Sequence, residues 1–247
     1  MKNSDLISHV AKDLLDDRQE LAGGEIDFFW SDDLIALYLS EAQRILCKDA
    51  WVMEDTDSPV TRVQLKENQT DYQLDKSILF VKMARLNDTD LTLFRTEFED
   101  NHPHMRQNFI ETPWESTTPF VENPGRPLTF STDMGTHILK IRPKPDADNA
   151  ALKVQMTVVR MPLYPISTAR GGDEPECPDE FHLDLCKYAA GQCLDRPTTE
   201  LELRTVGQRW KKEFLELVLK AKRDRKRFIQ AAPKFRYSGF THDLVHG

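Results

Sequence analysis

Residues 30–48 read WSDDLIALYLSEAQRILCK and carry the strongest helix signals in the chain. Ser31 is a favourable N-cap residue, and the two aspartates after it suit the positive end of a helix dipole. Trp30 and Ile35 occupy the two positions of a hydrophobic staple around that cap. The apolar residues that recur at helical spacing are Leu34, Leu37, Tyr38, Ala42 and Ile45. We therefore predict an amphipathic helix over residues 32–48.

Three other stretches show the same periodicity, over residues 6–14, 179–194 and 200–228. The last is the longest, and its apolar residues form a seam suited to packing on a partner helix. We expect the four helices to pack as one bundle. Its predicted core comprises Leu34, Leu37, Tyr38, Ile45, Phe181, Leu185, Trp210, Phe214 and Leu217.

Between the first and last helices the apolar period changes from helical to two, over residues 51–161. Alternating stretches such as 60–65, 78–83 and 152–159 are separated by Asn, Asp, Gly and Pro turns. This pattern predicts an antiparallel sheet or a small sandwich.

The expected fold class is α+β, in which N- and C-terminal helices form one bundle and an antiparallel β-sheet or small β-sandwich is inserted between them. The predicted parts are residues 1–50 for the first bundle helices and 51–165 for the β-insertion domain. Residues 175–230 hold the remaining bundle helices, and 231–247 form an extended docking tail.

Composition narrows the class of protein. Of 247 residues, 39% are hydrophobic and 30% charged, which is typical of a folded chain. No apolar run approaches the roughly 18 residues that span a bilayer, so we expect no membrane partner. The first residues turn acidic at once and lack the apolar region of a secretory signal, so we expect synthesis in a cytoplasm.

Charge is unevenly distributed along the chain. The net charge is −8, yet residues 204–236 hold twelve Lys or Arg against three Asp or Glu. The basic residues are followed by aromatic side chains, whose exposure to water is unfavourable. Ring-rich segments with Arg are typical of protein interfaces. The predicted docking residues are Lys222, Arg223, Arg225, Lys226, Arg227, Phe228, Phe235, Arg236, Tyr237 and Phe240.

Two alternatives to protein docking remain for this basic segment. It could bind nucleic-acid phosphates while its rings stack on bases. It could also be a solvated helix end, where cations complement the helix dipole. A contact in which aromatic side chains are interleaved with the cations favours assembly, and a purely basic solvent face favours DNA.

Catalytic motifs are not evident. The sequence has no phosphate-loop, dinucleotide, zinc-protease or Gly-x-Ser-x-Gly pattern. Cys47, Cys177, Cys186 and Cys193 lack zinc spacing, and we expect buried free thiols. We accordingly expect no catalytic site, no metal site and no cofactor.

Three weaker readings of possible chemistry stay open. His102 and His104 suit either two metal ligands or an exposed turn. His182 and Cys186 lie four residues apart, which suits a thiolate–imidazole pair or two structural side chains. A carboxylate-dependent hydrolase would need two carboxylates that converge in a pocket.

Three stretches resemble motifs of the phage head-to-tail adaptor family, also called connector or head-completion proteins. Residues 30–44 are similar to the family's second helix, and 174–185 to its Pro-rich approach to the third. Residues 70–75 resemble its Tyr-x-Leu-Pro strand start, although Asp75 stands where proline is usual. The turns at 125–127 and 141–145 also resemble those of the family.

This resemblance implies a structural virion protein at the head–tail interface, without catalytic residues. It implies a homo-oligomeric ring, commonly of twelve copies, that extends the DNA ejection channel. The C-terminal helix and tail would bind the portal protein, and the β-region would face tail or nozzle proteins. Genomic DNA would pass without sequence-specific binding, which suits an acidic body that repels phosphate.

Overall fold

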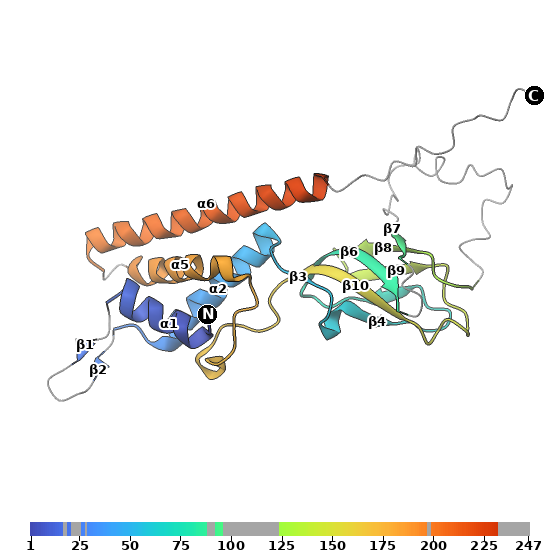
Figure 1. The fold of residues 1–247 in the computed structure, drawn as a ribbon, viewed down its shortest axis with the longest axis horizontal. Coiled ribbons are helices and arrows are strands. Elements are labelled where there is room, and N and C mark those ends of the chain that lie inside the picture. Colours follow the sequence, from blue (N-terminus) through green and yellow to red (C-terminus); the bar gives the residue numbers. More distant parts are fainter. Residues whose placement is uncertain are drawn as a thin grey trace, which may run out of the picture.

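The computed structural model describes residues 1–16, 19–20, 26–27, 29–87, 92–95, 124–196 and 199–231. The molecule is elongated, with a helical bundle at one end and two β-sheets at the other (Figure 1). The chain enters the sheets after its first helices and returns to the bundle for its last ones. The predicted α+β fold class is confirmed.

Among the described residues, four helices build the bundle. Helix α1 (Asn3–His9) continues as a π-helical turn, η1 (Val10–Leu14). Helix α2 (Asp32–Ala50) follows the short hairpin of β1 (Gln19–Glu20) and β2 (Ile26–Asp27). The return segment contains the 3-10 turns η3 (Thr168–Arg170) and η4 (Asp179–Phe181), and helices α5 (His182–Leu194) and α6 (Leu201–Ala231) complete the bundle.

Helix α2 begins where its cap signal predicts. The Ser31 side chain accepts a hydrogen bond from the backbone N–H of Leu34 at 3.3 Å. This bond satisfies one of the free N–H groups of the first turn. The helix ends at Ala50, and the left-handed backbone of its C-cap residue Trp51 (φ 57°) turns the chain toward the sheets.

The core face of α2 differs from the predicted stripe. Its fully buried side chains include Ile35, Leu39 and Leu46, whereas Leu37 is 61% exposed. Leu37 lies two residues from both Ile35 and Leu39, or about 200° around the helix, so it points away from the core. The assignment of Leu37 to the bundle core was wrong.

The other predicted core residues lie in or against the helical cluster. Leu185 and Phe214 are buried within it. The half-buried residues that pack against this cluster include Leu34, Tyr38, Ile45, Phe181, Trp210 and Leu217.

The first sheet is centred on β10 (Lys153–Arg160). Strand β6 (Ile78–Leu86) pairs antiparallel along one edge of β10, with register shifts near Val158. Along the other edge lie β4 (Arg62–Gln64), preceded by the 3-10 turn η2 (Pro59–Thr61), and β3 (Glu54–Asp55).

The second sheet has the order β5 (Asp71–Gln73), β9 (Ile138–Arg142), β8 (Thr129–Asp133), β7 (Phe94–Arg95). Strand β7 runs parallel to β8, whereas the sequence predicts only antiparallel pairing. The N–H of Leu93 bonds to Ala84 on β6 and that of Phe94 bonds to Leu128 before β8, so the chain passes from the first sheet to the second between these two residues. Residues 96–128 connect β7 to β8, and this connection is long enough for the crossover that parallel neighbours need.

The buried faces of the two sheets share one hydrophobic cluster, separate from that of the bundle. Its fully buried side chains include Phe130, Leu139, Ile141, Val154 and Met156. The insertion is therefore a small sandwich with its own core.

Candidate functional site

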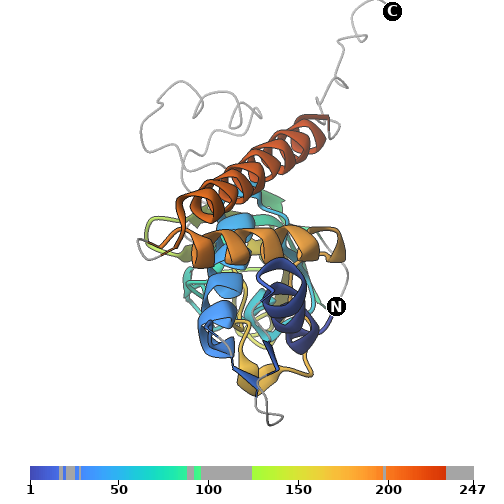
Figure 2. The ribbon, with the colours of Figure 1, turned by 90° about the vertical axis from the view of Figure 1, so that its left-hand side faces the viewer.

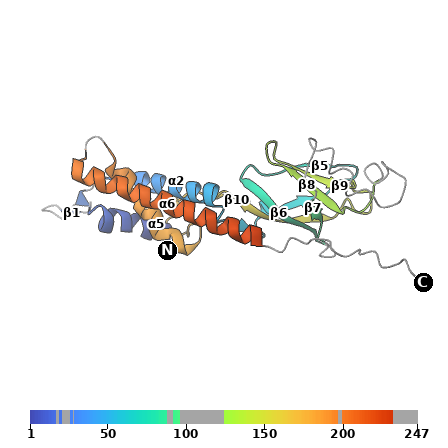
Figure 3. The ribbon, with the colours of Figure 1, turned by 90° about the horizontal axis from the view of Figure 1, so that it is seen from above.

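Helix α6 is the most prominent feature of the molecule. Its 31 residues extend about 46 Å. Viewed from above, it lies across α5 and α2, and its C-terminal end approaches the sandwich (Figure 3). Most of the predicted docking residues lie in its last turns or beyond them.

A pair of glycines allows α6 to lie directly on α5. A Cβ atom built on Gly191 would be 2.7 Å from the carbonyl oxygen of Gly207, and one on Gly207 would be 2.8 Å from the Cβ of Leu194. Close to this crossing, the rings of Tyr188 and Phe214 pack with centroids 4.8 Å apart. The two helix backbones are therefore in contact.

Asp195 fixes the first half of α6. Its carboxylate accepts hydrogen bonds from Lys211 Nζ at 2.7 Å, Gln208 Nε2 at 3.2 Å and Arg204 Nε at 3.2 Å. The bond from Lys211 is the main cause that lowers the pKa of Asp195 to about 2. Because these three residues share one side of α6, the interactions set its rotation about its own axis.

The C-terminal end of α6 is basic, and its cations differ in exposure. Arg223 is exposed, and Lys222 and Arg225 are half-buried. Arg225 Nη2 donates to the carbonyl oxygen of Val52 at 3.4 Å, so this side chain faces the bundle–sandwich junction. Lys226, Arg227 and Phe228 belong to the helix, but their side chains fall outside the described part. Phe235, Arg236, Tyr237 and Phe240 also lie outside the described residues.

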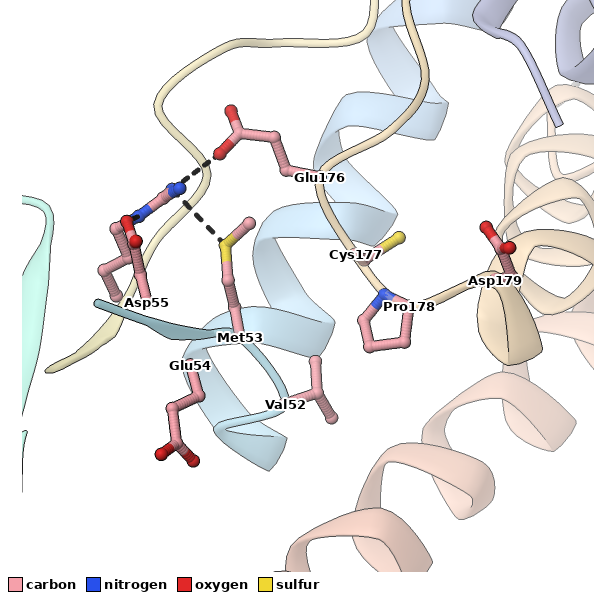
Figure 4. Close-up of a pocket in the computed structure, with 9 residues that line it drawn as sticks. Val52, Met53, Glu54, Asp55, Glu176, Cys177, Pro178 and Asp179 are labelled. Carbon is pink, nitrogen blue, oxygen red and sulfur yellow. Dashed lines mark hydrogen bonds and ion pairs between the residues drawn. The ribbon is translucent and has the colours of Figure 1, made fainter. Parts of the chain in front are cut away.

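A second polar cluster, centred on Arg160, connects the bundle to the sandwich. Arg160 is 8% exposed at the end of β10. Its Nε lies 2.5 Å from Asp55 Oδ2 on β3, and its Nη1 lies 2.6 Å from Glu176 Oε2 on the segment that returns to α5. Figure 4 shows Asp55, Met53 and Glu176 converging on the guanidinium group.

Electrostatics stabilise the charged forms of Asp55 and Arg160. Burial alone would raise the pKa of Asp55 and lower that of Arg160. Hydrogen bonds from Ser58 and Arg160 outweigh burial and hold the pKa of Asp55 well below its usual range. Bonds to Asp55 and Glu176 likewise raise the pKa of Arg160.

The Arg160 cluster borders an open pocket of about 500 Å³. Asp55 and Glu176 lie in this pocket, but both face Arg160 rather than a shared empty position (Figure 4). The pairing of both carboxylates with one cation suits a structural joint, and the pKa of Asp55 is held low. A hydrolase would instead need one carboxyl group held protonated as an acid.

Trp51 and Phe80 form an aromatic contact across the same junction. Their rings are stacked with centroids 6.3 Å apart, and the guanidinium of Arg95 lies 4.4 Å from the Phe80 centroid. The end of α2 is thereby packed on β6.

The four cysteines are free and buried, as predicted. Burial raises the pKa of Cys47, Cys177 and Cys186 to about 12. His182 Nε2 faces the carbonyl oxygen of Cys177 at 3.1 Å, whereas the thiol of Cys186 faces that of Leu6 at 3.9 Å. His182 and Cys186 thus have different partners, as two structural side chains would.

Within the described ranges, no three His, Cys, Asp or Glu side chains are grouped to hold a metal ion. The His102 and His104 pair lies outside those ranges. Among the described helices, none has the length and apolar character needed to cross a membrane.

A family model described as SU10 adaptor protein matches residues 1–233. The chain belongs to the SU10 adaptor protein family. The predicted membership of a phage head-to-tail adaptor family is thus confirmed, and with it a structural adaptor role. No match was found among curated proteins. The family match includes all of α6 and stops before four of the docking residues, Phe235, Arg236, Tyr237 and Phe240.

Two structural features of this adaptor were missed from the sequence. Arg160 gives no local signal, because its partners Asp55 and Glu176 are 105 and 16 residues away. Gly191 and Gly207, in contrast, are a signal that the sequence does carry. Glycine inside a helix lowers helix stability by up to about 1 kcal/mol relative to alanine, so its presence there indicates a packing reason.

Proposed function

We propose that this adaptor assembles as a ring beneath the portal and binds the portal through the basic end of α6 and the residues that follow. The observation that carries the proposal is the arrangement of α6. The Gly191–Gly207 crossing and Asp195 fix its first half, and its last turns present Arg223 to solvent. A rigid helix with a charged end suits a docking arm.

The character of this surface favours a protein partner over nucleic acid. Leu215 and Leu219 are exposed on α6 just before Arg223. Non-specific DNA binding relies on cations that neutralise phosphates and has no use for aliphatic side chains. Protein interfaces combine apolar residues with Arg. Nucleic-acid binding by this helix remains the alternative function.

The ring, which we propose to have twelve copies, would extend the channel for genomic DNA, and the sandwich would face tail or nozzle proteins. The basic end of α6 lies toward the sandwich (Figure 1). The proposal therefore places portal and tail contacts on different faces of the molecule rather than at opposite ends. The excess of acidic residues outside 204–236 suits a channel wall that does not retain DNA. We propose a virion location and no catalytic activity.

Mass photometry of the full chain, alone and mixed with the portal ring of the same phage, tests this function. We expect portal particles to gain mass close to one adaptor per portal subunit. Replacing Lys220 and Lys222 by Glu, at the same basic end of α6, should weaken this association at least tenfold, because two attractive contacts become repulsive. A portal that gains no mass with the unmodified chain would contradict the proposal.

A matched control separates local charge from net charge. The double variant Lys66→Glu and Lys76→Glu makes the same change in net charge at exposed positions of the sandwich. We expect it to bind the portal like the unmodified chain. Equal loss in both double variants would show that binding depends on overall charge and would exclude the basic end of α6 as the docking surface.

A further inference from the structure

Three exposed leucines lie on the outer faces of two bundle helices. Leu37 of α2 is 61% exposed, and Leu215 and Leu219 of α6 are 47% and 56% exposed. Single exposed leucines are ordinary on protein surfaces. These three differ because, on each helix, the exposed residues one turn before and one turn after the leucines carry charge of the same sign.

On α2, Leu37 lies between two exposed acids at helical spacing, Asp33 four residues before it and Glu41 four residues after it. We call these three residues the α2 stripe. Asp33 Oδ1 accepts a hydrogen bond from Thr168 Oγ1 at 2.6 Å, which leaves its other oxygen for a further partner. The α2 stripe is thus apolar at its centre and acidic at both ends.

On α6 the charges are reversed. Lys212 precedes Leu215 by three residues, and Arg223 follows Leu219 by four, and all four side chains are exposed. We call these residues the α6 stripe. Lys212 already faces Glu216 at 3.9 Å, but an exposed pair of this kind contributes little and exchanges readily. The α6 stripe is thus apolar at its centre and basic at both ends.

The directions of the two helices suit contact between copies. Helices α2 and α6 both run from the β1–β2 end of the bundle toward the sandwich (Figure 1). In the view along the bundle, α6 is seen above α5 and most of α2 below it (Figure 2). Rotation about an axis along the bundle preserves helix direction, so a neighbouring copy would present its α2 parallel to α6.

We propose that the α2 stripe of one copy packs against the α6 stripe of the next. Leu37 would lie between Leu215 and Leu219, with Asp33 near Lys212 and Glu41 near Arg223. The acids are about 12 Å apart along their helix and the cations about 16 Å, a difference that long Lys and Arg side chains can span. Two different patches meet, which is the heterologous contact that builds rings. This inference rests on the proposed ring and names the surfaces that close it. It assigns Arg223 to the neighbouring copy and leaves the portal contact to Lys220, Lys222 and the residues after Arg223.

Disulfide trapping tests the contact. The full-length variant Leu37→Cys, Leu219→Cys carries one new thiol on each stripe, while the four native cysteines are buried. Oxidation of the concentrated protein with copper phenanthroline should produce a ladder of dimers, trimers and larger disulfide-linked species. The matched control is Leu37→Cys, Leu183→Cys, because Leu183 is 54% exposed on α5 outside both stripes. This control should form at least tenfold less of the disulfide-linked dimers and larger species.

Two results would overturn the contact: no ladder from the first variant, or equal ladders from both. Neither would affect portal binding, which is measured separately on the unmodified chain. Portal binding without a ladder would therefore reject the stripes and leave the adaptor role intact.

A charge swap within the disulfide-trapping variant tests independently whether Glu41 and Arg223 meet across the contact. Adding Glu41→Arg or Arg223→Glu alone should slow ladder formation about threefold, and adding both should restore it, since the pair is re-formed with opposite signs. Failure of the double change to restore trapping would show that the two side chains do not meet.

Discussion

Arg160 binds together the two chain segments that connect the bundle to the sandwich. It contacts Asp55 on the chain that leaves the bundle and Glu176 on the chain that returns. Buried ion pairs contribute modestly to net stability, because desolvation offsets their attraction. Removing one partner lowers stability by more than the pair itself contributes, because the remaining charged groups are left buried and unpaired.

We predict that Arg160→Met lowers the free energy of unfolding by about 3–5 kcal/mol, as measured by urea denaturation at neutral pH. The matched control is Lys82→Met. Lys82 forms an ion pair of similar length with Glu54, 2.7 Å, but both side chains are more than a third exposed. Its loss should therefore cost less than about 1 kcal/mol. If the two variants lost equal amounts of unfolding free energy, burial would not be the reason that the Arg160 ion pairs stabilise the protein.

The loss of unfolding free energy caused by Arg160→Met should also depend on pH. Because Arg160 and Ser58 hold the pKa of Asp55 below its usual range, Asp55 contributes stability that is fully present above its unfolded pKa of about 3.9 and is lost as pH falls toward the lowered value. The difference between wild type and Arg160→Met should therefore narrow as pH drops below about 4. A constant difference across this range would argue against the Arg160–Asp55 pair.

At the scale of elements, the contact of α5 with α6 depends on two glycines. We predict that Gly191→Ala or Gly207→Ala destabilises the bundle by about 1–3 kcal/mol in thermal or urea unfolding, because the added methyl group overlaps backbone or Leu194 atoms. Alanine's better helix propensity would by itself act in the opposite direction.

Gly172→Ala is the control for this helix crossing. A Cβ atom there meets nothing within 4 Å, so we expect a change within about 0.5 kcal/mol. If Gly191→Ala stabilised the protein instead, α5 and α6 would have to be separated in solution.

The same elements show how far sequence reasoning reaches. The start of α2 was predictable because Ser31 and its partner Leu34 are three residues apart. Its core face was not, because leucines on several sides of α2 make a periodic pattern ambiguous, and Leu37 was misplaced. The passage of residues 92–95 between sheets depends on pairing with distant strands, which no local pattern encodes.

At the scale of the whole molecule, two hydrophobic cores are joined at the Arg160 cluster, and a basic helix lies over an otherwise acidic chain. This separation of charge bears on how the protein meets DNA. A channel-lining protein should let the duplex slide, which requires weak contact with phosphates. The many cations of residues 204–236 would have the opposite effect if they bound DNA.

We predict that the purified protein does not bind a short fluorescent duplex with submicromolar affinity at physiological salt, as measured by anisotropy. At low ionic strength weak binding is expected, because the exposed Arg223 remains attractive to phosphate. The double variant Lys222→Glu, Arg223→Glu should abolish that residual binding, whereas Lys66→Glu, Lys76→Glu should leave it largely intact. Submicromolar binding at physiological salt, with an affinity that falls steeply as salt rises, would mean that α6 neutralises several phosphates at once. The basic helix would then be a nucleic-acid surface, and the portal would have to be held by another part of the adaptor.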